Sequence, residues 1–370
     1  MKPIHEGGAD DRSLVEGAEP SRPADRRDNG ALEEIAAAAS RRDFFRGAGA
    51  AALGGALLAA AGFDPALANE LKKAQKPLKA AFSNAGLQAT WCAQGKQAAE
   101  AWGALMNVEV TWFDGELSAT KQRGSIDNMA AQQWDFVAIQ TFGIGTLTDP
   151  IQRMIDAGTP VIAMDTLIAP PGTIDITTFI APDNVFMGSV VTQELMKAIG
   201  GSGNVVMTQG ALGHSGAQGR AKGFKQVVAN YPDVKVIDEQ PADWDVTKVA
   251  RIWDSILTQH DDIKGAFFHN DDMALAAYNV MKAKGREGIV LGGVDAMPPA
   301  VNAVLDGRML TTVRNPSCRI HGWAVAAGVA AVAAGGKASA GIPEYILADG
   351  PVITADTAPG QLWLQKNFLM

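Results

Sequence analysis

Cysteine is scarce in this 370-residue chain, which contains only Cys92 and Cys318. Two cysteines are too few for the disulfide framework that stabilises many small secreted domains. In an oxidising compartment the two thiols could pair. The alternative is that each is a small buried thiol, and the sequence leaves both possibilities open.

Clustered basic residues and long apolar runs are also lacking. The formal net charge is −8, and no block of Lys and Arg occurs. Proteins that bind nucleic acid need such clusters to contact phosphates, so nucleic acid is not an expected partner. A membrane-spanning helix needs roughly 20 strongly apolar residues, and no segment after the N-terminal region reaches that length. The chain is therefore not expected to be embedded in a membrane.

Motifs of enzymes are missing as well. There is no G-x-x-x-x-G-K-[ST] phosphate loop and no G-x-G-x-x-G after the first expected strand. The five histidines, at positions 5, 214, 260, 269 and 321, lack metal-ligand spacing. These absences predict no enzyme, no metal and no cofactor.

One segment, Gly213-His-Ser-Gly-Ala217, looks like the nucleophile elbow of serine hydrolases. In an elbow, however, the serine follows a strand directly on a sharp turn. Here a loop over 210–214 separates Ser215 from the expected strand. Ser215 and Gln218 instead match a helix capping box, in which each side chain satisfies a free backbone N–H. Capping is the favoured interpretation, and a hydrolase is the rival.

The N-terminal region has the three parts of an export signal. A polar leader over 1–39 precedes Ser40-Arg-Arg-Asp-Phe-Phe-Arg46, a mildly apolar stretch covers 47–62, and Pro65-Ala-Leu-Ala68 supplies a small-residue cleavage site. The paired arginines resemble the twin-arginine type, which exports folded proteins. A membrane anchor is the rival, but the apolar stretch is short and rich in Gly and Ala. Residues 1–68 are therefore predicted to be an export signal, and the mature protein is expected in the periplasm.

The remaining chain predicts an α/β fold, because short apolar strand-like runs alternate with segments of helical period. The expected strands are Leu78–Ser83, Val108–Phe113, Phe136–Gln140, Val161–Met164, Thr178–Ala181, Val205–Gln209, Val234–Glu239, Ala266–His269, Ile289–Val294 and Leu310–Arg314. The expected helices include Trp91–Met106, Asn184–Ile199, Ser215–Asn230, Thr247–Gln259, Met273–Lys284 and Ile320–Ala334. Two sets of about five β-α steps predict two similar doubly wound parallel-sheet lobes, joined by a hinge, with a ligand cleft between them.

Polar side chains follow three of the expected strands. Asp165, Asn270 and Asp295 each come just after an apolar run. In parallel α/β sheets, ligands bind beyond the carboxyl ends of the strands. Helix capping is the other role of Asp and Asn at such positions, so a single residue proves little. Three together predict a pocket for a molecule rich in hydroxyl groups.

Two tryptophans also follow segments that end an expected strand. Trp91 follows the first expected strand, and Trp244 follows the segment Pro241-Ala-Asp243. An aromatic face packs on the C–H patches of a sugar, whereas core packing is the alternative for each of them.

Taken together, the segments from about Leu78 to Ala333 resemble the periplasmic sugar-binding proteins of the ribose-binding type, which are receptors of ABC importers. The most specific match is Asn270-Asp-Asp-Met-Ala-Leu275 after a strand, which sugar-responsive repressors share. No helix-turn-helix precedes the first strand, so the receptor is favoured over the repressor. The other matching stretches are Pro160–Asp165, Ala181–Asn184, Gly219–Phe224, Gln240–Asp245, Gly292–Asp295 and Thr311–Asn315.

The resemblance implies a set of ligand contacts. Asp165 and Asp295 would hold pairs of hydroxyls, while Asn270 and Asn315 would bond the ring oxygen or further hydroxyls. Trp244 would stack on the sugar, with Trp91 facing it from the other lobe. Weaker candidates in the loop after the first strand are Asn84 and Gln88.

Two positions depart from the family pattern. Thr166 and Gln218 stand where the family has arginines, so both are candidate ligand contacts with fewer donors. The absence of these two arginines argues against ribose and suggests a different pentose or a sugar alcohol. Arg314 could restore a positive group, or it could point away from the site.

The expected function is therefore a solute-binding receptor that closes its lobes on a pentose-like sugar or sugar alcohol. Its expected partner is the membrane permease of an ABC transporter, and a monomer is expected. A chemotaxis or sensor receptor with the same pocket is the alternative. The expected lobes are 77–183 with 316–345, and 184–315 with 346–370.

Overall fold

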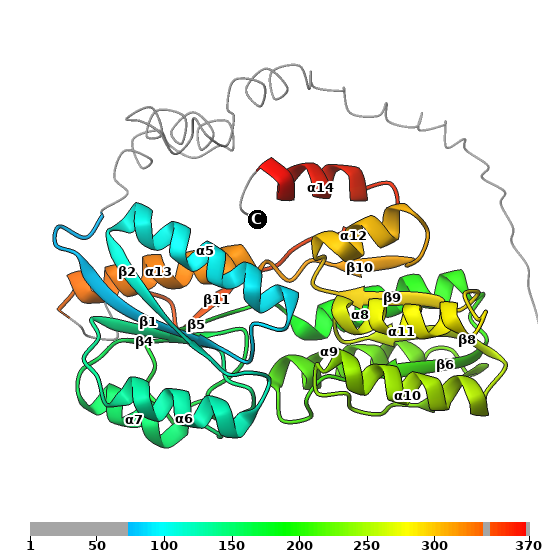
Figure 1. Cartoon of the computed structure of the whole chain (residues 1–370), viewed down its shortest axis with the longest axis horizontal. Helices are drawn as coiled ribbons and strands as arrows, with labels where there is room; N and C mark the ends of the chain where they lie inside the picture. The colour runs from blue at the N-terminus through cyan, green and yellow to red at the C-terminus, as the bar shows by residue number, and fades with distance from the viewer. Residues whose placement is uncertain (1–72, 336–340, 368–370) are drawn as a thin grey trace, which may run out of the picture.

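The computed structural model describes residues 73–335 and 341–367, which form two α/β lobes side by side (Figure 1). Each lobe contains one six-stranded sheet with helices on both faces. The expected fold class of two doubly wound parallel-sheet lobes is confirmed. The expected export signal over 1–68 lies outside the described residues.

The N-terminal lobe has a sheet of strand order β11-β5-β4-β3-β1-β2, and all of its pairings are parallel. Its strands are β1 (Leu78–Asn84), β2 (Val108–Asp114), β3 (Phe136–Ile139), β4 (Val161–Met164), β5 (Thr178–Ala181) and β11 (Tyr345–Leu347). Helices α5 (Thr90–Met106) and α13 (Ser317–Ala333) cover one face, and α6 (Ala119–Ala130) and α7 (Thr148–Asp156) cover the other. Its central strands are buried on both faces, which explains their unbroken apolar sequence.

The C-terminal lobe repeats this plan with the strand order β12-β10-β9-β8-β6-β7. Its strands are β6 (Gly203–Thr208), β7 (Val234–Asp238), β8 (Ile263–Phe268), β9 (Val290–Val294), β10 (Thr311–Val313) and the antiparallel edge strand β12 (Val352–Ile353). One face packs on α8 (Asn184–Ala198) and α9 (Ser215–Val228). The other packs on α10 (Val246–Gln259), α11 (Asp271–Ala283) and α12 (Pro298–Leu305), with α14 (Ala358–Asn367) against α12.

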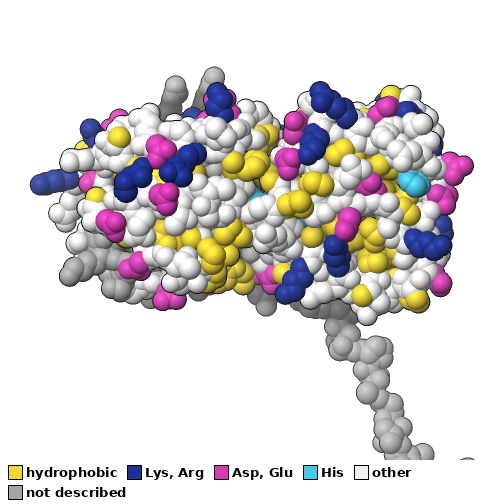
Figure 2. Space-filling view, turned by 90° about the horizontal axis from the view of Figure 1, so that it is seen from below, with side chains coloured by type: hydrophobic (Ala, Val, Ile, Leu, Met, Phe, Trp, Pro, Cys, Tyr) yellow, Lys and Arg dark blue, Asp and Glu magenta, His cyan; other side chains and the backbone are white. Residues whose placement is uncertain are grey.

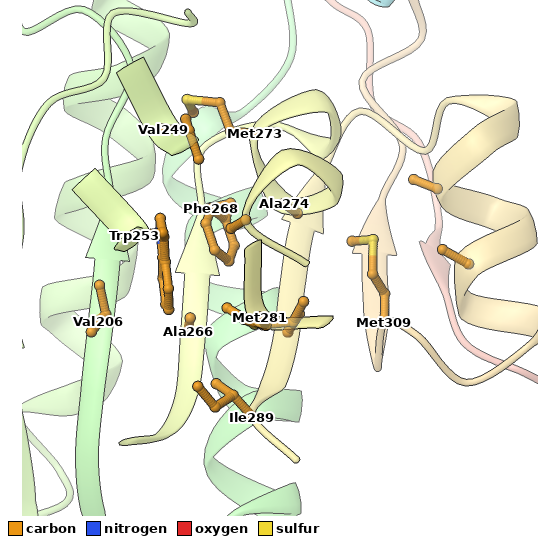
Figure 3. Packing of buried hydrophobic residues seen from close by; sticks show 14 of the residues in the cluster. Val206, Val249, Trp253, Ala266, Phe268, Met273, Ala274, Met281, Ile289 and Met309 are labelled. Atoms are coloured by element: carbon orange, nitrogen blue, oxygen red, sulfur yellow. The ribbon is translucent and has the colours of Figure 1, made fainter. Parts of the chain in front are cut away.

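A close view of the apolar core in the C-terminal lobe shows how the sheet packs on α10 and α11 (Figure 3). Trp253 and Met273 come from the helices and pack against Val206 and Phe268 of the strands. Burial of each large apolar side chain contributes about 1.5–3 kcal/mol. The indole N–H of Trp253 also donates to Thr208 Oγ1 over 2.9 Å, so this buried polar group is satisfied.

Within the described residues, the chain crosses between the lobes three times. The first crossing follows Ala181, the second follows Val313, and the third follows Leu347. β11 extends past the boundary expected at residue 345, because Leu347 is still in register with Ala181 of β5. Three adjacent crossings provide a hinge about which two lobes can move.

The two cysteines are free and buried, so they are not paired. Within 73–335 and 341–367, no helix is long and apolar enough to cross a bilayer. On the face shown in Figure 2, positive and negative side chains are interspersed over both lobes.

Candidate functional site

A cavity with an empty volume of about 380 Å³ lies between the lobes. The lining residues are Ala85, Ala89, Trp91, Cys92, Leu117, Gln140, Asp165, His214, Arg220, Trp244, Asn270, Asp295 and Asn315. Most of the polar ones follow the carboxyl ends of β3, β4, β8, β9 and β10, the edge where parallel sheets bind ligands.

Six of the ten candidate residues line this cavity, and four do not. The six are Trp91, Asp165, Trp244, Asn270, Asp295 and Asn315. The four outside it are Asn84, Gln88, Thr166 and Gln218. The six lining residues come from both lobes, so side chains as distant in sequence as Trp91 and Asn315 line the same cavity.

The four remaining candidates have other surroundings. Asn84 is buried, and its Nδ2 donates to the Cys92 carbonyl over 3.2 Å. Gln88 is exposed. Thr166 is buried against the His214 ring. Gln218 is exposed on α9 and donates to the Leu212 carbonyl. We therefore do not retain them as direct ligand contacts.

The expected capping box at the start of α9 is wrong. His214 is the N-cap residue, and its Nδ1 accepts from the Gly216 N–H over 3.1 Å. The Ser215 hydroxyl instead accepts from the Leu167 N–H of the other lobe over 3.0 Å. Within the described part of the chain, Ser215 has no hydrogen bond to a histidine, so no Ser–His nucleophile pair is assembled.

Asp165 collects donors from three parts of the chain. Gln140 Nε2 donates to its Oδ2 over 2.9 Å, and Asn315 Nδ2 donates to its Oδ1 over 3.0 Å. His214 Nε2 lies 3.6 Å from Oδ2. A carboxylate has about four lone-pair directions, so Asp165 is held in place while capacity remains for a ligand hydroxyl.

Asp295, in the C-terminal lobe, faces the guanidinium of Arg220. Arg220 Nη2 lies 3.5 Å from Asp295 Oδ1, and both side chains are buried. Arg220 is itself fixed, because its Nε donates to Asn184 Oδ1 over 2.9 Å and its Nη1 donates to the His269 carbonyl. Its other bonds orient the guanidinium, so this positive group is preorganised for a ligand.

Arg220 is a residue that the sequence analysis missed. It is on the buried face of α9 together with Ala217 and Phe224, three positions before it and four after it. A basic residue on the apolar side of an amphipathic helix is costly unless it is paired, and this was the available signal. Arg314, the alternative source of positive charge, is buried but does not line the cavity.

Trp244 packs deep in the cavity wall. Its ring lies under the Arg220 guanidinium, 5.7 Å from carbon to centroid, and meets the His214 ring edge-on. A Cβ atom on Gly210 would come within 2.1 Å of the indole, so only glycine fits there. Trp91 is fixed differently, since its Nε1 donates to the Asn315 carbonyl at the hinge over 3.1 Å.

Backbone strain is concentrated around the cavity. The φ angles of Asp165, Trp244 and Asp295 are 57°, 65° and 114°, in the region that favours glycine. Such conformations cost of the order of 1–3 kcal/mol each and persist where the surroundings impose them. Their position at three cavity residues is typical of a functional site.

His214 is neutral and has a defined tautomer. Since Nδ1 accepts from the Gly216 N–H, the proton is on Nε2, which donates to Thr166 Oγ1 over 2.5 Å. Burial lowers the pKa of His214 to about 4, although the Asp165 carboxylate acts in the opposite direction. His214 therefore adds a neutral donor, not a second cation, to the cavity wall.

The lobes contact each other around the cavity, so the structure is a closed form. Thr166 and Leu167 bond His214 and Ser215 of the other lobe, and the Ile144 N–H donates to the Gly213 carbonyl over 2.8 Å. Leu117 of the N-terminal lobe packs against the apolar core of the C-terminal lobe. The cavity wall is thus complete only when the lobes are together.

The titration of Asp295 gives a pH-dependence that can be checked. Burial raises its pKa to about 8, although the Arg220 charge opposes this. Burial also raises the pKa of Asp271 well above its usual value. The buried histidines 214, 269 and 321 have lowered pKa values, mainly because of burial. In the unfolded chain a histidine has a pKa of about 6.5, so these residues are mostly uncharged in both states only above about pH 7. From there to about pH 8 the carboxyl groups dominate.

Over this window the folded protein holds protons that the unfolded chain has released, so stability falls as pH rises. We expect the free energy of unfolding of the ligand-free protein to decrease between about pH 7 and 8. The substitution Asp295→Asn should remove much of that slope, leaving the contribution of Asp271. Urea unfolding at both pH limits measures this change in the free energy of unfolding. An equal slope in wild type and Asp295→Asn would show that Asp295 is ionised throughout.

No group of three or more His, Cys, Asp or Glu side chains in the described part of the chain is arranged to hold a metal ion. The cavity offers hydrogen-bonding groups together with the indole rings of Trp91 and Trp244. Carboxylate and amide oxygens accept, while Arg220 and the Asn270 amide donate. Asn270 Oδ1 caps α11 through the Met273 N–H, and its Nδ2 has no partner among the described residues.

Comparison with known proteins agrees with this architecture. Residues 80–338 match the family model described as a periplasmic binding protein domain. The chain belongs to the periplasmic binding protein family. The expected resemblance to the ribose-binding type is confirmed.

Individual relatives support the same assignment. A xylitol-binding protein of Mycolicibacterium smegmatis is 30% identical over 236 residues, which cover 63% of this chain and 67% of the relative. The ribose import binding protein of Escherichia coli K12 is 28% identical over 201 residues, covering 54% and 67%.

Among solved structures, the arabinose-binding component of a Shewanella sp. ANA-3 ABC transporter has a TM-score of 0.71 at 25% identity, covering 78% of this chain and 95% of that one. A galactofuranose-binding protein has a TM-score of 0.73 at 24% identity, covering 80% and 100%.

Proposed function

We propose that this periplasmic binding protein captures an uncharged, pentose-like sugar or sugar alcohol by closing its lobes. It then presents the ligand to the membrane permease of an ABC importer. The relatives named for xylitol, ribose and arabinose support this class of ligand. The proposed route to the periplasm is twin-arginine export through residues 1–68, and the proposed working form is a monomer.

The observation that carries the proposal is the convergence of polar groups from both lobes on one cavity. Asp165 and Gln140 come from the N-terminal lobe, whereas Arg220, Asn270 and Asp295 come from the C-terminal lobe. A hydroxyl group can donate and accept, so a polyhydroxylated ligand can bond both sides at once. A ligand that bound open and closed forms equally would shift nothing, so contacts from both lobes are what favour closure.

The balance of charge in the cavity supports a ligand without a carboxylate. The cavity is lined by two carboxyl groups, Asp165 and Asp295, and by one guanidinium, that of Arg220, which faces Asp295. Thr166, where the resemblance implied an arginine, contributes no second cation. A ligand hydroxyl can donate to the Asp165 carboxylate, whereas a ligand carboxylate would be repelled by it. Sugar acids are therefore expected to bind poorly.

A thermal-shift screen against C4–C6 polyols, pentoses, hexoses and sugar acids tests this function. A ligand at about 100 times its Kd should stabilise the mature protein by about 2.7 kcal/mol, which is roughly 5 °C or more in melting temperature. We expect the largest shifts with five-carbon polyols or pentoses and none with the corresponding acids. A screen in which no sugar or polyol raises the melting temperature would refute the proposal.

A further inference from the structure

Helix α5 begins without a cap from its own lobe. The residue at its N-cap position is Ala89, whose side chain makes no capping hydrogen bond. The first N–H groups of a helix have no partner within the helix and need an acceptor from elsewhere. This end of α5 belongs to the ligand site, because Ala89, Trp91 and Cys92 all line the cavity.

The acceptor comes from the opposite lobe. Asp272 Oδ2 accepts from the Thr90 N–H over 2.8 Å, and its Oδ1 accepts from the Thr90 hydroxyl over 2.6 Å. Asp272 is in the first turn of α11. Its carboxylate is therefore at the N-termini of two helices from different lobes. A negative charge is favoured at the positive end of each helix dipole, so the arrangement benefits both helices only when the lobes are closed.

Asp272 is not among the residues that line the cavity, although Asn270 and Trp91 on either side of this bond are. We propose that Asp272 is a positioning residue, which caps α5 across the cleft and thereby couples lobe closure to the placement of Trp91. This inference rests on the proposed capture of a ligand by closure. It assigns part of the closing free energy to a bond that the ligand does not touch.

The bond differs in kind from the loop contacts on either side of the cleft. The contacts of residues 144 and 167 with the 213–215 loop involve uncharged groups. The Asp272 bond is charge-assisted, and such bonds are about twice as strong as neutral ones. When the cleft opens, this bond breaks and the first N–H groups of α5 are exposed to water. The bond therefore stabilises the closed form, and loss of Asp272 should chiefly accelerate ligand release.

The test compares Asp272→Ala and Asp272→Asn with the control Asp127→Ala in the mature protein. Asp127 is another aspartate, and its carboxylate binds Arg123 and Arg153 within the N-terminal lobe. With xylitol as the probe, stopped-flow release should be at least about tenfold faster in Asp272→Ala, with an intermediate rate in Asp272→Asn, because an amide oxygen can still accept from Thr90. The control should release xylitol at the wild-type rate.

A second measurement needs no ligand. Hydrogen exchange of the backbone amides at the start of α5 should be faster in Asp272→Ala than in Asp127→Ala, while exchange elsewhere in α5 is similar. Failure of xylitol to bind the wild type would count against the proposed ligand class, and the exchange result alone would then decide on Asp272. Release and exchange that match the control in both Asp272 variants would overturn the inference.

Discussion

Asp165→Ala should weaken ligand binding at least a hundredfold, which is about 2.7 kcal/mol. The carboxylate is buried and accepts from Gln140 and Asn315, with His214 nearby. It would also accept from ligand hydroxyls, and a hydrogen bond to a charged group contributes about 1.5–3 kcal/mol. Alanine removes the ligand's acceptor and releases the side chains that shape the cavity.

Isothermal titration calorimetry with the best ligand from the screen measures this effect. Asp175→Ala is the matched control, because Asp175 is an exposed aspartate of the same lobe. The control should bind as the wild type does. An Asp165→Ala protein that is folded and binds within threefold of wild type would remove Asp165 from the ligand site.

Arg220→Met should abolish measurable ligand binding and destabilise the fold by about 3–5 kcal/mol. Methionine retains an apolar stem but leaves Asp295 as a buried carboxyl without its counter-charge. It also removes the donors to Asn184 and the His269 carbonyl. Urea unfolding measures the stability, with the exposed Arg153→Met as the control.

The double variant Arg220→Met/Asp295→Asn separates folding from binding. Because neither partner is then charged, stability should recover in part relative to Arg220→Met. Ligand binding should remain lost, since both the donor and the carboxylate are missing. Recovered binding in the double variant would show that Arg220 acts on the fold alone.

Much of the fold follows from the sequence because parallel strands buried on both faces are apolar along their whole length. The expected strand at Val161–Met164 has the observed bounds, and the helix expected over Trp91–Met106 begins one residue earlier, at Thr90. The edge strands β11 and β12 were not anticipated. They are only three and two residues long, and their pairing partners are distant in sequence.

The site was predicted where a polar residue follows a strand directly, as Asp165 and Asp295 do. It was missed where the side chain reaches the cavity from a helix or through a neighbour. Arg220 is such a case, since the family resemblance implied Gln218 in its place, although the helix turns Gln218 to solvent. Gln140 was interpreted as the end of β3, whereas its amide donates to Asp165. Contacts between lobes, such as Thr90 with Asp272, have no local sequence signal.

A crystal structure of the mature protein with its best sugar or polyol would test the central claim most directly. We predict closed lobes and one ligand in the cavity, with its hydroxyls within hydrogen-bond distance of Asp165, Asp295 and Asn270. A ligand bound outside this cavity, or one that contacts a single lobe, would contradict the account.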